Sequence, residues 1–168
     1  PGRARGYKDE LEFNREQYSL GHEGNYSFGK WNSYISQTET KTKGRTIPTG
    51  TFAQNAYAGA DRNLKNTDIV ADTHIIAPIA NHILTVGAEY KKAEVADDLA
   101  GMGAKFDKDS YSFYAEDEWR LRDNLAFTFG GRYEDHSGFG GQFSPRGYLV
   151  WNASDAWTFK GGVSTGYK

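Results

Sequence analysis

The residue types that catalyse reactions or bind metals are present in this chain, but they do not form a recognisable site. The four histidines make no HExxH pair and no close cluster in the sequence; they are His22, His74, His82 and His136. Cysteine is absent, which excludes disulfides, thiolate metal sites and a cysteine nucleophile. Asp135 and His136 resemble an acid–base pair, but adjacent residues of a strand point to opposite faces of a sheet. We therefore expect neither an enzyme nor a bound cofactor or metal.

Two other patterns have ordinary structural explanations. Ser144 precedes Pro145 and lacks the pattern of a nucleophile elbow. The glycines of GFGG (138–141) do not follow the strand–loop–helix order that a phosphate-binding loop needs, so we expect a hairpin turn there.

The net charge of −2 gives no basic signal for nucleic acid, and we expect no nucleic-acid partner.

Charged side chains also gather between residues 39 and 66, a segment without sustained periodicity that contains Gly, Pro, Thr and Asn. We expect a long loop here, and loops longer than about 12–15 residues are usually functional or disordered. Its cations are Lys41, Lys43, Arg45, Arg62 and Lys65, and Phe52 and Tyr57 lie between them.

The elements that would position this loop alternate between apolar and polar side chains, most clearly from 109 to 168. In the last segment Trp157, Phe159 and Val163 share one face, and Lys160 and Ser164 share the other. A period of two indicates β-strands. No run of about 18 apolar residues is present, so we expect no transmembrane helix. The mean hydropathy of −0.74 still allows a membrane barrel, because only every second strand residue meets lipid.

The pattern predicts about eight strands, after a leading loop at 1–14. They are 15–22, 30–38, 67–77, 82–96, 109–121, 125–136, 142–151 and 157–168. Short connections (24–29, 78–81, 122–124, 152–156) alternate with longer ones (39–66, 97–108, 137–141). Short turns at one end and longer loops at the other are the signature of an outer-membrane barrel. The predicted fold class is therefore all-β, an antiparallel transmembrane β-barrel segment.

The strands can be aligned so that apolar faces meet. We expect Trp119 to lie opposite Phe127, and Trp151 to lie opposite Trp157. The three tryptophans then fall near the short turns, where one aromatic girdle of a barrel belongs. Asp117 is the exception on the apolar face. We place it toward the girdle, where an acid costs only about 0–1 kcal/mol.

The other face carries charged side chains that we expect to face the barrel lumen: Glu116, Arg132, Arg146 and Lys160. Glu116 is expected to lie diagonally from Arg132 and to form an ion pair with it. Such a pair is costly in a narrow barrel unless it is fully satisfied, and it costs little in a wide, water-filled lumen.

Six segments together resemble a known family. They are REQYSLGHEG (15–24), LTVGAEY (84–90), EDEW (116–119), GGRYEDH (130–136), FSPR (143–146) and WTFKGGVSTGYK (157–168). In this order they resemble the barrel of TonB-dependent outer-membrane receptors, in the branch that contains the colicin I receptor and the ferric-enterobactin receptor. The resemblance runs through most of the chain and leaves the long loop unmatched.

This resemblance implies a barrel of about 22 strands closed by an N-terminal plug. Residues 1–168 would be part of the barrel domain in the bacterial outer membrane, with the plug absent. The whole receptor would import a ferric siderophore, of the catecholate class, with energy from TonB through the missing plug. Its partners would be the siderophore, TonB, outer-membrane lipid and, in a parasitic use, a colicin.

A ferric catecholate is anionic and aromatic, so cationic and aromatic loop residues would attract and stack on it. This motivates Arg45, Tyr57 and Arg62 as ligand contacts, with an ordinary solvated loop as the equally weighted alternative. A different function is also open: a small independent eight-stranded outer-membrane barrel with a structural or adhesin-like role. Side chains fill the interior of such a barrel, and the many charges and glycines of the polar face argue against close filling.

Overall fold

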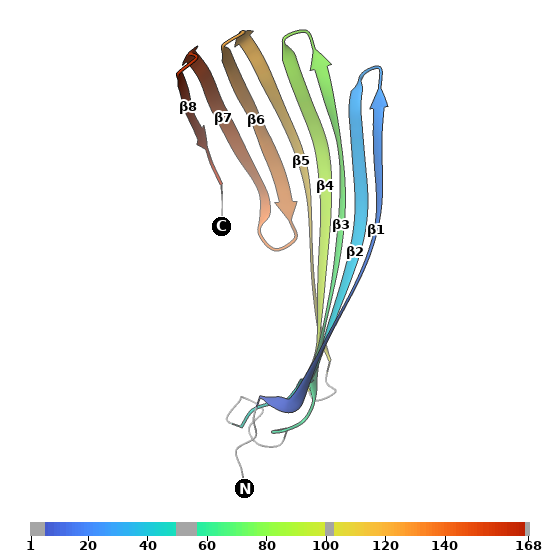
Figure 1. The fold of residues 1–168 in the computed structure, drawn as a ribbon. Coiled ribbons are helices and arrows are strands. Elements are labelled where there is room, and N and C mark those ends of the chain that lie inside the picture. Colours follow the sequence, from blue (N-terminus) through green and yellow to red (C-terminus); the bar gives the residue numbers. More distant parts are fainter. Residues whose placement is uncertain (1–5, 50–56, 100–102, 167–168) are drawn as a thin grey trace. The chain divides into compact units, whose positions relative to one another are not determined.

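One sheet of eight strands makes up the described part of the chain (Figure 1). The computed structural model describes residues 6–49, 57–99 and 103–166. Each strand is hydrogen-bonded to the next one along the sequence. The strands are β1 (Tyr7–Tyr26), β2 (Gly29–Arg45), β3 (Arg62–Ile79), β4 (His82–Leu99), β5 (Ala104–Arg122), β6 (Leu125–His136), β7 (Gly140–Ser154) and β8 (Trp157–Ser164). The all-β antiparallel fold expected from the sequence is confirmed.

The chain divides into two compact units, and β1 to β5 contribute to both. The loop unit holds residues 1–19, 36–69 and 92–108, and the turn unit holds residues 20–35, 70–91 and 109–168. The strands β6, β7 and β8 lie wholly within the turn unit. In the part of the chain that the structure describes, no helix is long and apolar enough to cross a membrane.

Short and longer connections alternate along the chain, as predicted. Two-residue turns at 27–28, 80–81, 123–124 and 155–156 join β1 to β2, β3 to β4, β5 to β6 and β7 to β8. The other connections span 46–61, 100–103 and 137–139. All four two-residue turns belong to the turn unit.

Several predicted strand boundaries are wrong. Residues 7–14 belong to β1 rather than to a leading loop, and β2 continues to Arg45 while β3 begins at Arg62. The long loop is therefore 46–61, not 39–66, and the 97–108 loop shrinks to 100–103. Segments such as ETKTKGR (39–45) have no apolar positions, so hydropathy gives no period-two signal. Their backbones nevertheless continue the hydrogen-bonded ladder.

The register was predicted correctly for one hairpin and wrongly for the other. Trp119 lies opposite Phe127, as expected. Trp151 lies opposite Phe159 instead of Trp157, because β7 continues to Ser154 and contains a bulge between Asn152 and Ser154. The error is a slip of two residues, which leaves every side chain on its predicted face.

Glycines allow aromatic rings to lie flat across neighbouring strands. A Cβ atom at Gly87 would lie 2.4 Å from Cζ of Tyr114 and 2.8 Å from Cβ of His74. A Cβ atom at Gly131 would lie 2.5 Å from Cζ of Phe143. Gly87 on β4 therefore leaves the path along which Tyr114 of β5 reaches across toward β3.

The sheet has two free edges and almost no core of its own. Within the described residues, β1 and β8 are the end strands of the sheet and do not pair with each other. The eight strands therefore do not close into the small independent barrel that was the alternative. Among the same residues Ile47 is the only buried hydrophobic side chain, with 2% exposed, and Phe113, Trp151 and Phe159 are exposed.

Candidate functional site: the polar face of the turn unit

Charged and polar side chains from five strands gather on one face of the turn unit. We call them the polar-face cluster: Asp72 and His74 (β3), Glu89 (β4), Tyr114 and Glu116 (β5), Arg132 and Glu134 (β6) and Arg146 (β7). Their positions alternate with those of the apolar side chains, so the strand period of two collects them on one surface.

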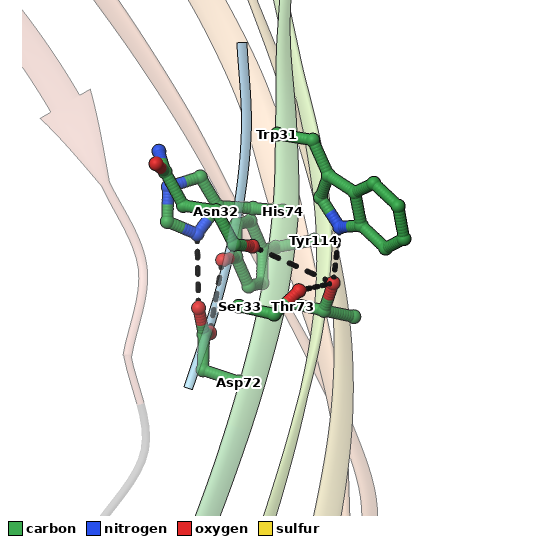
Figure 2. A network of polar contacts seen from close by, with 7 residues as sticks. All are labelled: Trp31, Asn32, Ser33, Asp72, Thr73, His74 and Tyr114. Carbon is green, nitrogen blue, oxygen red and sulfur yellow. Dashed lines mark hydrogen bonds and ion pairs between the residues drawn. The ribbon is translucent and has the colours of Figure 1, made fainter. Parts of the chain in front are cut away.

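Asp72 accepts hydrogen bonds from two strands (Figure 2). His74 Nδ1 lies 2.9 Å from one carboxylate oxygen, and the Tyr114 hydroxyl donates to the other at 3.1 Å. Asn32 Nδ2 lies 3.1 Å from His74 Nε2, so the amide donates to Nε2 and the ring donates from Nδ1 to Asp72. The network joins β2, β3 and β5. Both ring nitrogens of His74 are hydrogen-bonded, so the histidine has no free proton acceptor.

The opposite side of β3 carries a second set of hydroxyl contacts, also visible in Figure 2. Trp31 Nε1 donates to Thr73 Oγ1 at 2.9 Å, and Ser33 Oγ lies 2.6 Å from the same oxygen. These polar groups lie among apolar neighbours and are satisfied by one another, which is the condition for polar groups in contact with hydrocarbon.

Arg132 is the most connected cation of the cluster. Its Nη2 donates to Glu89, its Nε donates to Glu134 at 3.2 Å, and its guanidinium carbon lies 5.8 Å from the centroid of the Tyr114 ring. Two carboxylates and an aromatic ring therefore surround one guanidinium, which holds β4, β5 and β6 together on this face.

The predicted ion pair between Glu116 and Arg132 is wrong, because Glu116 pairs with Arg146 instead. The register explains the exchange. Glu116 and Arg146 both lie opposite Gly130, one on each side of β6. Gly130 has no side chain to separate them, so the two long side chains meet across it. Arg132 lies opposite Tyr114 and reaches Glu89 beyond it.

Six members of the polar-face cluster, all except His74 and Glu134, line a pocket of about 530 Å³ together with Ser144 and Thr165. Its arginines are paired with neighbouring carboxylates. In residues 6–49, 57–99 and 103–166, no three His, Asp or Glu side chains are grouped to hold a metal ion. Lys160 lies opposite Val150 on β7, and within these residues it forms no ion pair.

Asp117, the acid on the apolar face, has a partner that sequence reasoning missed. His82 Nδ1 lies 2.7 Å from one oxygen of Asp117, and the His82 ring stacks on Trp119 with centroids 5.5 Å apart. The signal was present in the sequence, because His82 has the same parity as Leu84 and Val86 in its strand. Parity alone could not say which residue of β5 lies beside it.

In the loop unit, Arg62 is bound to a carboxylate. Its Nε lies 2.8 Å and 3.1 Å from the two oxygens of Asp97. A strand crosses a bilayer in about 9–11 residues, and Asp97 lies further than that along β4 from the turn at 80–81. The Arg62 hydrogen bonds hold the pKa of the Asp97 carboxyl below its usual range, so the pair is intact at neutral pH.

The other predicted ligand contacts of the loop unit are Arg45 and Tyr57, and the charge of Arg45 also helps to lower the pKa of the Asp97 carboxyl. Lys41 and Lys65 both bind Glu39 at 2.6 Å, but within the described residues no carboxylate pairs with Arg45. Tyr57 is 41% exposed. Phe52 lies outside the described residues. Arg62, the third predicted ligand contact, binds Asp97 and does not contact the side chain of Arg45 or Tyr57.

Comparison with known proteins identifies the family to which this chain belongs. A family model described as TonB dependent receptor-like, beta-barrel matches residues 1–168. An iron-regulated outer membrane virulence protein of Vibrio cholerae is 30% identical over 161 residues, which are 94% of this chain and 22% of that protein. The ferric enterobactin receptor PirA of Pseudomonas aeruginosa is 26% identical over 178 residues, which cover 92% of this chain and 24% of that protein.

A solved structure agrees with these sequence relatives. The siderophore receptor PirA from Acinetobacter baumannii matches with a TM-score of 0.72 and 25% identity, over 92% of this chain and 25% of that one. The chain thus spans 22% and 24% of the length of the two curated relatives named above.

The two arginines of the polar face should differ in their effect on stability. We expect Arg132→Gln in the full-length protein to cost about 1–2 kcal/mol, because it leaves Glu89, which is 16% exposed, without that partner. Arg146→Gln should cost less than about 1 kcal/mol, because that side chain is 62% exposed. Urea unfolding in detergent measures both, and an equal or reversed ranking would contradict the assignment of Arg132 as the central cation.

Proposed function

Because the chain belongs to the family of TonB-dependent receptor β-barrels, we propose that it is a wall section of a receptor that imports ferric siderophores across the bacterial outer membrane. The observation that carries this proposal is the two-faced sheet. One face exposes aromatic side chains to lipid, and the other carries paired charges that suit a water-filled lumen. In this arrangement Glu116, Arg132, Arg146 and Lys160 line the lumen.

The proposed receptor is longer than this chain, and its partners act through parts that lie elsewhere in it. A plug domain closes the lumen and receives energy from TonB. The 168 residues contribute about eight strands to a barrel of about 22. A colicin is a further proposed partner of the whole receptor.

The proposed substrate is a ferric siderophore of the catecholate class. The Pseudomonas aeruginosa relative is named a ferric enterobactin receptor, and enterobactin is a catecholate. A ferric catecholate carries negative charge on aromatic rings, which suits an exposed guanidinium and an exposed tyrosine. Arg45 and Tyr57 supply these two groups in the loop unit. Arg62 contributes positive charge while it remains bound to Asp97.

Iron uptake tests the proposed function directly. The full-length receptor, expressed in a bacterium that lacks its own catecholate receptors, should restore growth on ferric enterobactin under iron limitation. Growth should require TonB, and a ferric hydroxamate should not replace the catecholate. Failure to grow, with folded receptor shown at the cell surface, would overturn the proposal.

Ligand binding tests the loop residues separately. Arg45→Ala and Tyr57→Ala should each weaken binding of ferric enterobactin between a few-fold and about thirtyfold, the range expected for loss of a cation or aromatic contact. Arg62→Ala should have a smaller effect because Asp97 occupies its guanidinium. Lys43→Ala is the matched control, since Lys43 lies two residues from Arg45 and pairs with Glu12. Quenching of receptor fluorescence measures the affinities, and equal losses for Arg45→Ala and Lys43→Ala would refute a specific contact.

A further inference from the structure

A bulge at the turn end of β5 changes the face on which Arg122 lies. Arg120 lies opposite Ala126, and Arg122 lies opposite Leu125, with the register shift between them. Directly opposed residues of antiparallel strands share a face. Leu125 in turn lies opposite Trp151, on the apolar face. The extra residue of the bulge therefore moves Arg122 from the polar face to the apolar one, beside the tryptophans of the short turns.

The surroundings of Arg122 are those of a membrane interface. Trp119 precedes it by three residues on β5, and Trp151 and Phe159 continue its row across β7 and β8, with ring centroids 5.6 Å apart. Tryptophan rings at this level of a membrane protein lie among the lipid headgroups. An exposed arginine in the same row places its guanidinium where headgroup phosphates lie.

Asp123 follows Arg122 in the turn, but the two side chains do not form an ion pair. Arg122 is exposed, and in the part of the chain that the structure describes it forms no ion pair. Asp117, the acid on the apolar face of the same strand, is hydrogen-bonded to His82. Arg120, two residues away, faces the other side and pairs with Glu118 at 3.5 Å. A guanidinium binds phosphate oxygens with two parallel hydrogen bonds, so a phosphate matches Arg122 in charge and in geometry.

We propose that Arg122 binds the phosphate of a phospholipid headgroup in the leaflet that faces the short turns. The bulge in β5 presents the guanidinium, and Trp119 and Trp151 pack beside the headgroup. This inference depends on the membrane location and on the register, not on the siderophore. A receptor that imports nothing would still bind lipid at Arg122.

Lipid binding to the full-length receptor tests the proposal. Native mass spectrometry in detergent, with added phosphatidylglycerol, measures the affinity for single lipids. Arg122→Gln should weaken phosphatidylglycerol binding about fivefold, the effect of one cation near a membrane surface. Arg122→Lys should keep most of the affinity. Arg120→Gln, which removes the same charge from the opposite face, should bind like the unaltered receptor. Phosphatidylcholine, which also carries a phosphate but has no net charge, should show a smaller loss on Arg122→Gln.

Three outcomes would overturn it. One is wild-type affinity in Arg122→Gln, and another is an equal loss in Arg120→Gln, which would mean that general charge attracts the lipid. The third is measured on the unaltered receptor and needs no variant to fold: phosphatidylglycerol binding that does not weaken as salt is raised would exclude an exposed guanidinium as its site.

Discussion

The whole structure depends on the two faces of one sheet meeting different surroundings. In a soluble protein the apolar face of such a sheet would be covered by a second layer. Here, within the described residues, one hydrophobic side chain is buried, while Phe113, Trp151 and Phe159 lie open. Lipid supplies the missing layer, since the chain belongs to an outer-membrane receptor family. Continuous strand pairing follows from the same constraint, because an unpaired backbone group in hydrocarbon costs several kcal/mol.

Polar groups are arranged on each face according to what that face meets. On the polar face, Arg132 and Arg146 are held by carboxylates of other strands, and water can solvate what remains. On the apolar face, Asp117 is hydrogen-bonded to His82, whose ring stacks on Trp119, and the hydroxyl of Thr73 accepts a hydrogen bond from Trp31. Glycines complete the arrangement. Gly130 lets Glu116 and Arg146 meet across β6, and Gly87 lets Tyr114 reach Asp72 across β4.

The sequence predicted what depends on period two and missed what depends on exact position. Strand number and the alternation of short and longer connections followed from apolar alternation. The strand end at 39–45 was missed because it has no apolar side chains and therefore no alternation. The strand end at 7–14 was missed although Tyr7, Leu11 and Phe13 alternate on one face. The partner of Arg132 was missed because Glu116 meets Arg146 across Gly130, a position without a side chain, and Arg132 pairs with Glu89 instead. The register of Trp151 was missed because a bulge leaves no signal in hydropathy. The Asp117–His82 pair joins residues 35 positions apart, and parity could suggest a shared face but not a contact.

The most direct test of this account is a map of solvent along β6 in the full-length receptor. These 168 residues contain no cysteine, so once any cysteine elsewhere in the receptor is replaced, single cysteines can be placed at Leu125, Phe127 and Phe129 and at Ala126 and Thr128. Spin labels at the odd positions should collide with oxygen dissolved in lipid, and labels at the even positions with a water-soluble relaxation agent. The account predicts this strict alternation with period two. Equal exposure of both sets to water, or lipid contact at Ala126 and Thr128, would contradict it.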